Sequence, residues 1–250
     1  MLDRRRFLTI SGGASALLLT GCDRLNGNEQ FRGVLRSAEG LTMRAQRLIL
    51  DRADLAREFS EADMSPFFRS NGTAMPGTPT YARHLASGFA DWRLRVDGLV
   101  SRPLSLSLPQ IRTMPMRTQI TRHDCVEGWS AIGKWHGVPL QTVLTAAGLR
   151  DGARYIVFHC MDQLGGRSYY ESIDLIDAFH PQTILAWGMN GAMLPVPNGA
   201  PLRLRVERQL GYKHAKYIER IEAVESLAGV YGGRGGFWED NGDYEWYAGI

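Results

Sequence analysis

The feature that most constrains the fold is an irregular series of strand-like segments with short helices between them. Apolar or alternating runs lie at 92–96, 155–159, 183–187, 202–206 and 215–221, and each has the length of a single strand. Their spacing is uneven, so the chain lacks the regular alternation of strand and helix that builds a parallel sheet, and it has no internal repeat. The sequence therefore predicts one α+β domain built on a mixed sheet.

Segments whose apolar residues have the spacing of a helix lie before and between these runs. Helices are predicted at 41–59, 108–111, 139–147 and 172–179. Gly148 suits the end of the third helix, and Ser172 is a candidate N-cap for the last. A short strand at 119–121 would lead into the segment around Cys125. The aromatic residues of the tail from 229 to 250 argue against disorder, so we expect this tail to pack over the domain.

The N-terminus predicts export. A charged start at 3–6 precedes an apolar, small-residue run that is too short to span a membrane. Arg4-Arg5 followed by Phe7-Leu8 resembles a twin-arginine signal, and Leu-Thr-Gly-Cys ending at Cys22 resembles a lipoprotein box. The expected organisation is a signal at 1–21, a tether and N-terminal helix at 22–60, and a catalytic domain at 61–250. We expect a periplasmic domain, held at the inner membrane through a lipid on Cys22.

Charge excludes one class of partner. Without residues 1–21, 229 residues remain with 26 basic and 25 acidic side chains, so nothing indicates nucleic-acid binding. This length suffices for one domain with a sizeable core.

Two cysteines remain besides Cys22. Cys125 and Cys160 would lie in an oxidising compartment, where a disulfide between them is one alternative. Metal ligation or deep burial would also protect a free thiol.

The segment from Arg122 to Trp129 is the richest in chemistry. It places Cys125 after Arg122 and His123 and before a Gly-Trp turn. A thiolate is both a nucleophile and a soft metal ligand. The residues alone leave open a Cys–His nucleophilic pair, a metal ligand and a buried structural thiol, whereas a zinc site lacks a second cluster of ligands.

Further motifs follow Cys125 in a definite order. The motifs are Cys-Val-Glu-Gly-Trp at 125–129, Trp-x-Gly-Val-Pro-Leu at 135–140, the stretch 166–173, Leu-Ala-Trp-Gly-Met-Asn-Gly at 185–191, Asn-Gly-Ala-Pro-Leu-Arg-Leu at 198–204 and Gly-Tyr-Lys-x-x-Lys at 211–216. This ordered series, spanning about residues 65 to 225, resembles the molybdopterin-binding domain of the sulfite oxidase family. The resemblance implies the mixed-sheet fold of that family and a molybdenum-molybdopterin cofactor.

The resemblance also implies roles for individual residues. Cys125 would supply the protein thiolate to molybdenum, while a pterin dithiolene supplies the other sulfurs. The remaining cofactor contacts implied are Asn71, Cys160, Asn198, Arg203, His214, Ala215 and Lys216. Cationic side chains and backbone donors suit the anionic phosphate of the pterin. A structural thiol is an equal alternative for Cys160, and Lys213 is left out as solvated.

The residues that would contact the substrate match the sulfite oxidase family less well. Arg122 and His123 are candidates for substrate binding or proton delivery, since histidine can titrate near neutral pH; the alternative is that they support the Cys125 loop. Arg69 is a weaker candidate for binding an oxyanion, because its segment departs from the Arg-Asn-His of sulfite oxidases. Trp187 stands where sulfite oxidases carry a tyrosine that assists at the active site, which puts sulfite oxidation in doubt.

The function implied is oxygen-atom transfer, with molybdenum cycling between Mo(VI) and Mo(IV). Reduction of a sulfoxide, on a small molecule or an oxidised side chain, is favoured over oxidation of sulfite or another small anion. The three cysteines include no haem or iron–sulfur motif, so electrons would come from a partner, as in bacterial relatives that pair with a haem-containing membrane protein. A cofactor-free scaffold lipoprotein and a Cys–His hydrolase are the distant alternatives.

Overall fold

The computed structural model describes residues 27–49 and 51–250, so the predicted signal and Cys22 lie outside the described residues. The chain divides into two compact units, 1–49 and 50–250. None of the helices in the described part of the chain combines the length and apolarity needed to cross a bilayer.

The described part of the first unit is essentially one helix, α2 (Glu29–Ile49). Asn28 begins it by accepting hydrogen bonds from the backbone of Gln30 (2.9 Å) and Phe31 (3.2 Å). The helix predicted at 41–59 is therefore wrong in both bounds. Beyond Ile49, the Asp51 carboxylate accepts from the backbone of Ala53 (2.9 Å), and such local side-chain bonds compete with helix formation.

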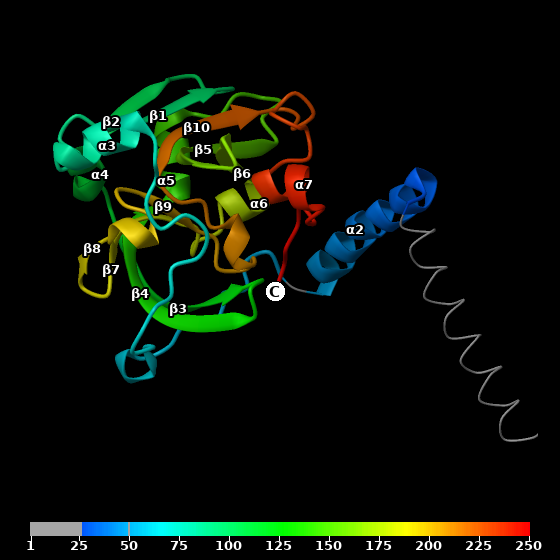
Figure 1. The fold of residues 1–250 in the computed structure, drawn as a ribbon, viewed down its shortest axis with the longest axis horizontal. Helices are drawn as coiled ribbons and strands as arrows, with labels where there is room; N and C mark the ends of the chain where they lie inside the picture. Colours follow the sequence, from blue (N-terminus) through cyan, green and yellow to red (C-terminus); the bar gives the residue numbers. More distant parts are fainter. Residues whose placement is uncertain (1–26, 50) are drawn as a thin grey trace, which may run out of the picture. The chain divides into compact units, whose positions relative to one another are not determined.

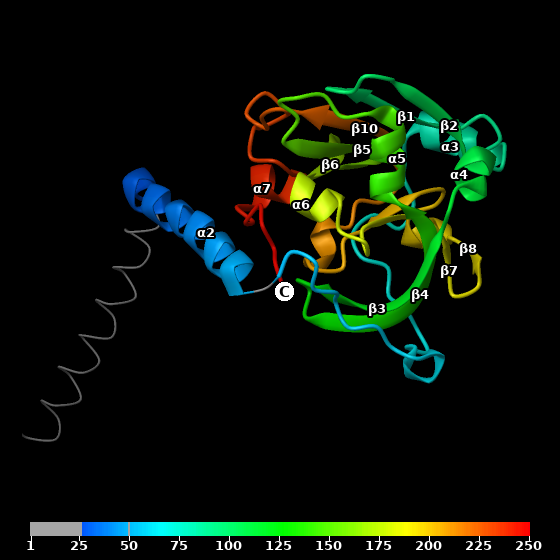
Figure 2. The same cartoon turned by 180° about the vertical axis from the view of Figure 1, so that it is seen from behind.

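The second unit contains two five-stranded sheets, seen from two sides in Figures 1 and 2. The first sheet has the order β2-β1-β10-β5-β6. Its strands are β1 (Arg93–Gly98), β2 (Leu104–Ser107), β5 (Tyr155–Leu164), β6 (Arg167–Asp174) and β10 (Ile218–Val224). β1 and β10 pair in parallel while the other pairs are antiparallel, which confirms the predicted mixed sheet.

The second sheet is antiparallel, in the order β3-β4-β7-β8 with β9 also paired to β7. Its strands are β3 (Arg117–Cys125), β4 (Trp129–Pro139), β7 (Ile184–Met189), β8 (Ala192–Met193) and β9 (Arg203–Arg205). The β3–β4 hairpin is the long curved ribbon of Figure 1 and carries Cys125 at its turn.

Short helices connect these strands, and the main core lies between the sheets. The helices are α3 (Pro79–Ala86), α4 (Leu108–Thr113), α5 (Leu140–Ala147), α6 (Leu175–Ala178), α7 (Phe237–Gly242), and the 3-10 turns η1 (Glu61–Asp63), η2 (Val196–Asn198) and η3 (Gly211–Lys213). The core joins Phe158 and Ile221 of the first sheet to Val138 and Leu204 of the second, all at most 1% exposed. This shared apolar burial makes the two sheets one folding unit.

Local patterns predicted most of these elements. The five strand runs, α4, and α5 with its stop at Gly148 (φ 67°) are confirmed. The helix predicted at 172–179 exists but is shorter, α6 (Leu175–Ala178); its predicted start and N-cap are wrong, because Ser172 pairs with Val157 inside β6 and the N-cap is Asp174. The strand ladder satisfies the backbone of Ser172, which outweighs its local preference for a cap.

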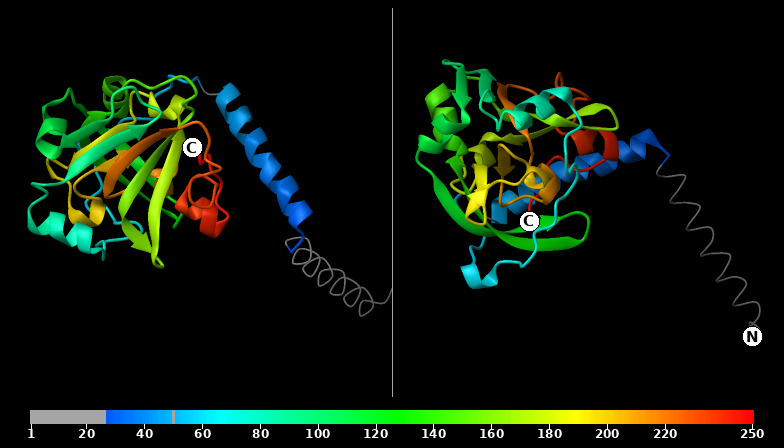
Figure 3. Two further views of the ribbon diagram at one scale, coloured as in Figure 1. Left: turned by 90° about the horizontal axis from the view of Figure 1, so that it is seen from above. Right: turned by 60° about the vertical axis from the view of Figure 1, so that its left-hand side comes forward.

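Both ends of the second unit pack onto its body. Residues before the predicted boundary at 61 already belong to it, since Phe59 donates from its backbone to Ile120 (2.9 Å). At the C-terminus, Phe237 and Tyr247 are buried, as expected for the aromatic tail. Figure 3 (left) shows this segment in red beside β6.

Candidate functional site

Cys125 ends strand β3 with its side chain turned inward. The burial pattern alternates along the strand, so Thr121, His123 and Cys125 face the interior while Arg122 faces solvent. A turn follows, in which Gly128 donates to the carbonyl of Cys125 (3.0 Å). Burial raises the pKa of the Cys125 thiol, so ionisation must come from a ligated metal or another positive charge.

Cys125 lines a cavity of ≈ 240 Å³ built from five parts of the chain. The lining residues are Asn71, Gly72, Thr73, Cys125, Val126, Glu127, Asp162, Leu164, Tyr169, Tyr212, His214, Lys216, Trp238 and Tyr244. Of the predicted site residues, Asn71, Cys125, His214 and Lys216 are thus brought together.

Arg203 lies buried behind this cavity without a carboxylate partner. It donates to the carbonyl of Asn198 (3.1 Å) and to Oδ1 of Asn71 (3.3 Å), while its Nε has no partner. Among the residues that the structure describes it forms no ion pair. Desolvation lowers its pKa to about 9. A buried guanidinium left with neutral partners is suited to a bound anion.

Lys216 is a second buried cation beside Arg203. Its ammonium donates to the backbone carbonyls of Asn71 (2.6 Å), Pro197 (3.0 Å) and Thr73. Desolvation and the nearby Arg203 charge lower its pKa to about 7. The Nδ2 donor of Asn198 is also buried without a partner. This donor set, with Cys125 across the cavity, fits the phosphate and polar rim of a pterin cofactor.

His214 and Ala215 complete the predicted pterin segment in different ways. His214 lines the cavity, and its Nε2 lies 3.0 Å from the carbonyl of Gln209. Burial and the nearby arginines lower the pKa of His214 well below its usual range, so its ring is neutral. The backbone N–H of Ala215 already donates to Lys213 (3.1 Å). The structure therefore does not support Ala215 as a backbone donor to the pterin.

His123 does not reach the cavity, contrary to its predicted role in substrate binding or proton delivery. It is 1% exposed, and its Nδ1 lies 2.9 Å from Nη1 of Arg205. Burial lowers the pKa of His123 well below its usual range, so it does not titrate near neutrality. A Cβ at Gly211 would lie 2.5 Å from its Nε2; only glycine lets η3 approach this ring.

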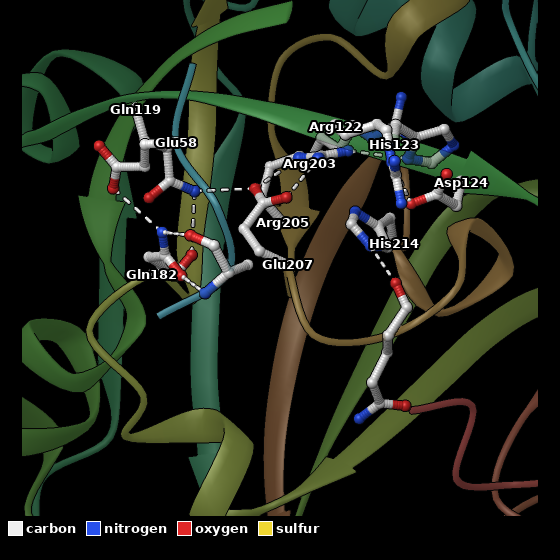
Figure 4. A network of polar contacts seen from close by, with 12 residues as sticks. Glu58, Gln119, Arg122, His123, Asp124, Gln182, Arg203, Arg205, Glu207 and His214 are labelled. Atoms are coloured by element: carbon white, nitrogen blue, oxygen red, sulfur yellow. Dashed lines mark hydrogen bonds and ion pairs between the residues drawn. The ribbon is translucent and has the colours of Figure 1, made fainter. Parts of the chain in front are cut away.

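A polar network extends from His123 through the second sheet (Figure 4). Arg205 binds Glu207 through two contacts of 2.9 and 2.5 Å, with both side chains fully buried. Glu207 also accepts from Gln119 (2.8 Å). Since His123 also contacts the ring of His214 with centroids 5.0 Å apart, this network supports the cavity wall. The alternative expectation for His123, support of the Cys125 loop, agrees with these contacts.

Three other predicted residues lie away from the cavity. The Arg122 side chain is 57% exposed and paired with Asp124 (2.9 Å) on the outer face of β3. Arg69 is exposed and does not line the cavity. Cys160 does not line the cavity; like Cys125 it is a free thiol, and it lines a neighbouring hollow of ≈ 350 Å³ that shares Asp162 with the cavity. The structure thus gives no support to the roles predicted for these three residues.

Trp187 also lies outside the cavity. Its ring stacks with that of His136 (centroids 6.4 Å apart) and under the guanidinium of Arg112 (5.0 Å). The aromatic residues that do line the cavity are Tyr169, Tyr212, Trp238 and Tyr244, and none of them was predicted as a site residue. Tyr169 and Tyr212 lie in the family-like motifs at 166–173 and 211–216, whereas the only signal for Trp238 and Tyr244 was the aromatic content of the C-terminal tail.

Lys213 is the clearest correction among the charged residues. It was left out as solvated, yet its side chain is fully buried between Glu171 and Glu239, each 2.5 Å away. Two carboxylates in one buried site raise the pKa of Glu171, chiefly through desolvation and then through Glu239.

The described residues contain no group of three or more His, Cys, Asp or Glu side chains that could hold a metal. Cys125 is therefore a lone thiol on a cavity that Asn71 and Lys216 line and that Arg203 adjoins through its hydrogen bond to Asn71. This arrangement suits a metal that arrives already held by an organic ligand.

Comparison with known families agrees with this geometry. The model of the oxidoreductase molybdopterin binding domain matches residues 82–229, more than half of the chain, and the chain belongs to this family. It is a molybdenum-dependent oxidoreductase of the sulfite oxidase type with a molybdenum-molybdopterin cofactor.

Its similarity to individual relatives is extensive. A putative protein-methionine-sulfoxide reductase subunit YedZ1 of Azospira oryzae is 39% identical over 249 residues, which cover 98% of this chain and 87% of that protein. The protein-methionine-sulfoxide reductase catalytic subunit MsrP of Xanthomonas campestris pv. campestris is 32% identical over 236 residues, covering 90% and 71%.

A solved structure shares the fold. The sulfane dehydrogenase SoxCD from Paracoccus pantotrophus aligns with a TM-score of 0.50 at 22% identity, covering 54% of this chain and 39% of that one. This likeness concerns the α+β fold alone.

Proposed function

We propose that this protein reduces sulfoxides in the periplasm, with electrons from a membrane-bound haem protein. When bound, the cofactor supplies two-electron oxygen-atom exchange at molybdenum. In the net reaction the sulfoxide sulfur gains two electrons, the S–O bond breaks, and the oxygen leaves as water with two protons. Cys125 would hold the metal, while Arg203, Lys216, Asn71 and Asn198 would hold the pterin.

The observation that carries this proposal is the neutral, aromatic wall facing Cys125. Tyr212, Trp238 and Tyr244 line the cavity, and His214 is uncharged. Such a wall suits a neutral dipole with apolar substituents, which is the chemistry of a sulfoxide.

The charged residues that line the cavity also favour a neutral substrate over an anion. Among the described residues that line it, Lys216 is the sole cation, and it already donates to three carbonyls. Glu127 and Asp162 place carboxyl groups on the same lining; burial raises the pKa of Asp162 to about 6. With Lys216 taken up by the pterin, as proposed above, an incoming anion such as sulfite meets these carboxyl groups and no further cation among the described lining residues. Sulfite oxidation is therefore the less favoured function.

The relatives named as protein-methionine-sulfoxide reductases support the same substrate class. A separate electron donor is proposed because the sequence holds no haem or iron–sulfur motif. The periplasmic location rests on the twin-arginine and lipoprotein patterns at 4–22.

The test is turnover in both directions with molybdenum-loaded protein. Dimethyl sulfoxide, free methionine sulfoxide and an oxidised peptide would be assayed with reduced benzyl viologen, and sulfite with ferricyanide. Cys125→Ser supplies the background rate. We expect sulfoxide-dependent oxidation of the viologen and little sulfite turnover. Efficient sulfite oxidation with no reduction of any sulfoxide would overturn the proposal.

A further inference from the structure

The C-terminal segment supplies one wall of the Cys125 cavity. Trp238 and Tyr244 line it, and their rings stack with centroids 5.5 Å apart. Tyr244 also packs edge-on against Tyr212 of η3 (5.0 Å). The wall is therefore a continuous aromatic surface from two distant parts of the chain.

This wall is fixed in place by buried polar contacts. Lys213 binds Glu239 of α7 and Glu171 of β6, each at 2.5 Å. Nε1 of Trp246 donates to the hydroxyl of Ser172 (2.9 Å), and the Tyr212 hydroxyl donates to the carbonyl of Glu245 (2.6 Å). The C-terminal segment is thus a rigid part of the site, held to β6 and η3.

An open groove of ≈ 390 Å³ adjoins the cavity along α7. Its lining residues are Leu164, Gly165, Arg167, Phe237, Trp238 and Asn241. Leu164 and Trp238 line both the groove and the cavity, so the two spaces are neighbours on either side of these side chains. Figure 3 (left) shows the two elements concerned, the β5–β6 hairpin and the red C-terminal segment, side by side.

The groove has an apolar floor and a polar rim. Leu164, Phe237 and Trp238 supply the apolar surface, while Arg167 donates to the side-chain oxygen of Asn241 at the rim. The guanidinium has further N–H groups, and the Asn241 amide nitrogen donates to the backbone of Phe237 (2.7 Å). An extended polypeptide offers what such a surface binds: apolar side chains for the floor and backbone carbonyls for the guanidinium.

We propose that this groove binds the polypeptide that flanks an oxidised methionine, with Trp238 directing the sulfoxide side chain into the Cys125 cavity. The inference rests on the proposed function. A small free sulfoxide needs only the cavity, whereas a residue within a chain needs a path for the backbone out of it. The groove is placed to provide that path because Leu164 and Trp238 line both it and the cavity.

The experiment compares three substrates with molybdenum-loaded protein: dimethyl sulfoxide, free methionine sulfoxide, and a nine-residue peptide with central methionine sulfoxide and apolar neighbours. The variants are Arg167→Ala, Trp238→Ala and Trp238→Phe. The control is Phe179→Ala, since Phe179 is 40% exposed and lies outside the cavity and the groove. The readout is kcat/KM for each substrate and the Kd of the peptide by calorimetry.

Wild type should have a higher kcat/KM for the peptide than for free methionine sulfoxide. In Arg167→Ala the ratio of peptide to dimethyl sulfoxide kcat/KM should fall about tenfold, mainly through KM, as for one lost charged hydrogen bond. The ratio of peptide to dimethyl sulfoxide kcat/KM should be closer to the wild-type value in Trp238→Phe than in Trp238→Ala. In Phe179→Ala it should equal the wild-type value.

Equal kcat/KM for the peptide and free methionine sulfoxide in wild type would overturn the proposal that the groove binds the flanking polypeptide. So would equal losses for peptide and dimethyl sulfoxide in Arg167→Ala. If no sulfoxide is reduced, the proposed function fails, but calorimetry still shows whether the groove binds the peptide. In that case, peptide binding that weakens in Arg167→Ala supports it, and no binding overturns it.

Discussion

At the scale of single residues, position on a strand separates side chains that are neighbours in sequence. Arg122 and His123 adjoin each other, yet one faces solvent and the other is buried against Arg205. Cys125 shares the inward face with His123 but lies at the strand end, where the cavity opens. Only Cys125 of these three is therefore placed to bind a metal in the cavity.

Replacing this thiol should remove the metal. Cys125→Ser is expected to lose most bound molybdenum and sulfoxide turnover. A serine hydroxyl is a harder donor than a thiolate, and it is a far weaker acid than a thiol, so it ionises much less readily. Elemental analysis of the purified protein measures the metal. Cys160→Ser is the matched control: Cys160 lines another hollow, so its molybdenum content should stay near wild type. Equal molybdenum in Cys125→Ser and wild type would contradict the assignment.

The buried ammonium of Lys216 makes a prediction for the cofactor-free protein. Its pKa is lowered from 10.5 to about 7 on folding, so between these pH values the unfolded chain binds the proton and the folded chain does not. The free energy of unfolding should therefore rise with pH in this window, by roughly 1–3 kcal/mol between pH 7 and 9.5.

Urea unfolding of cofactor-free protein checks this, with Lys216→Met as the reference. The difference between the two proteins isolates the lysine, and it should shrink in loaded protein, where the pterin phosphate keeps the ammonium charged. A difference that is independent of pH from 7 to 9.5 would contradict the lowered pKa.

At the scale of elements, η3 and α7 are short and gain their stability from contacts with the rest of the fold. η3 approaches β3 because Gly211 leaves room for the His123 ring. α7 has six residues, too few for a stable isolated helix. The cluster of Lys213, Glu171 and Glu239 joins both elements to β6.

Breaking this cluster should loosen the C-terminal wall. Lys213→Met leaves two buried carboxyl groups without their cation, and we expect a loss of roughly 3–5 kcal/mol in the free energy of unfolding. Chemical denaturation measures the loss. Arg234→Ala removes a solvent-exposed ion pair with Asp243 from the same segment and should cost under about 1 kcal/mol. A Lys213→Met protein as stable as Arg234→Ala would show that the cluster contributes little.

At the scale of the whole molecule, the catalytic unit follows a helix and a predicted lipid anchor. α2 places Phe31, Val34, Leu41 and Leu48 at the three- and seven-residue spacing of one face of an amphipathic helix. Such an arrangement suits a domain that works beside a membrane-bound electron donor.

The predicted lipid anchor at Cys22 can be tested by where the protein fractionates. In a host that lipidates exported proteins, the wild type should fractionate with the inner membrane, and Cys22→Ser should lose most of that association, because lipidation needs the thiol of Cys22. Immunoblots of membrane and periplasmic fractions measure the distribution. Cys160→Ser should stay with the membranes. Unchanged membrane association of Cys22→Ser would contradict lipid anchoring.

The sequence by itself determined most strand segments, the mixed sheet and the family, and it predicts Cys125 as the molybdenum ligand. Periodicity reports which residues form an element, and the ordered motifs around Cys125 are specific enough to indicate the cofactor. Asn71, His214 and Lys216, which were predicted as cofactor contacts, line the same cavity as Cys125. Their motifs lie in loops and turns that depend on backbone shape.

Only the tertiary structure decided which side chains face the cavity and which charges are buried. Lys213 and Glu239 are 26 residues apart, and Arg203 and Asn71 are 132 apart, so no local pattern reveals their contacts. Trp238 and Tyr244 became part of the site because the tail folds back over η3 and β6. The physical reason is that burial and charge pairing depend on contacts between distant segments, whereas strand and helix patterns depend on neighbours.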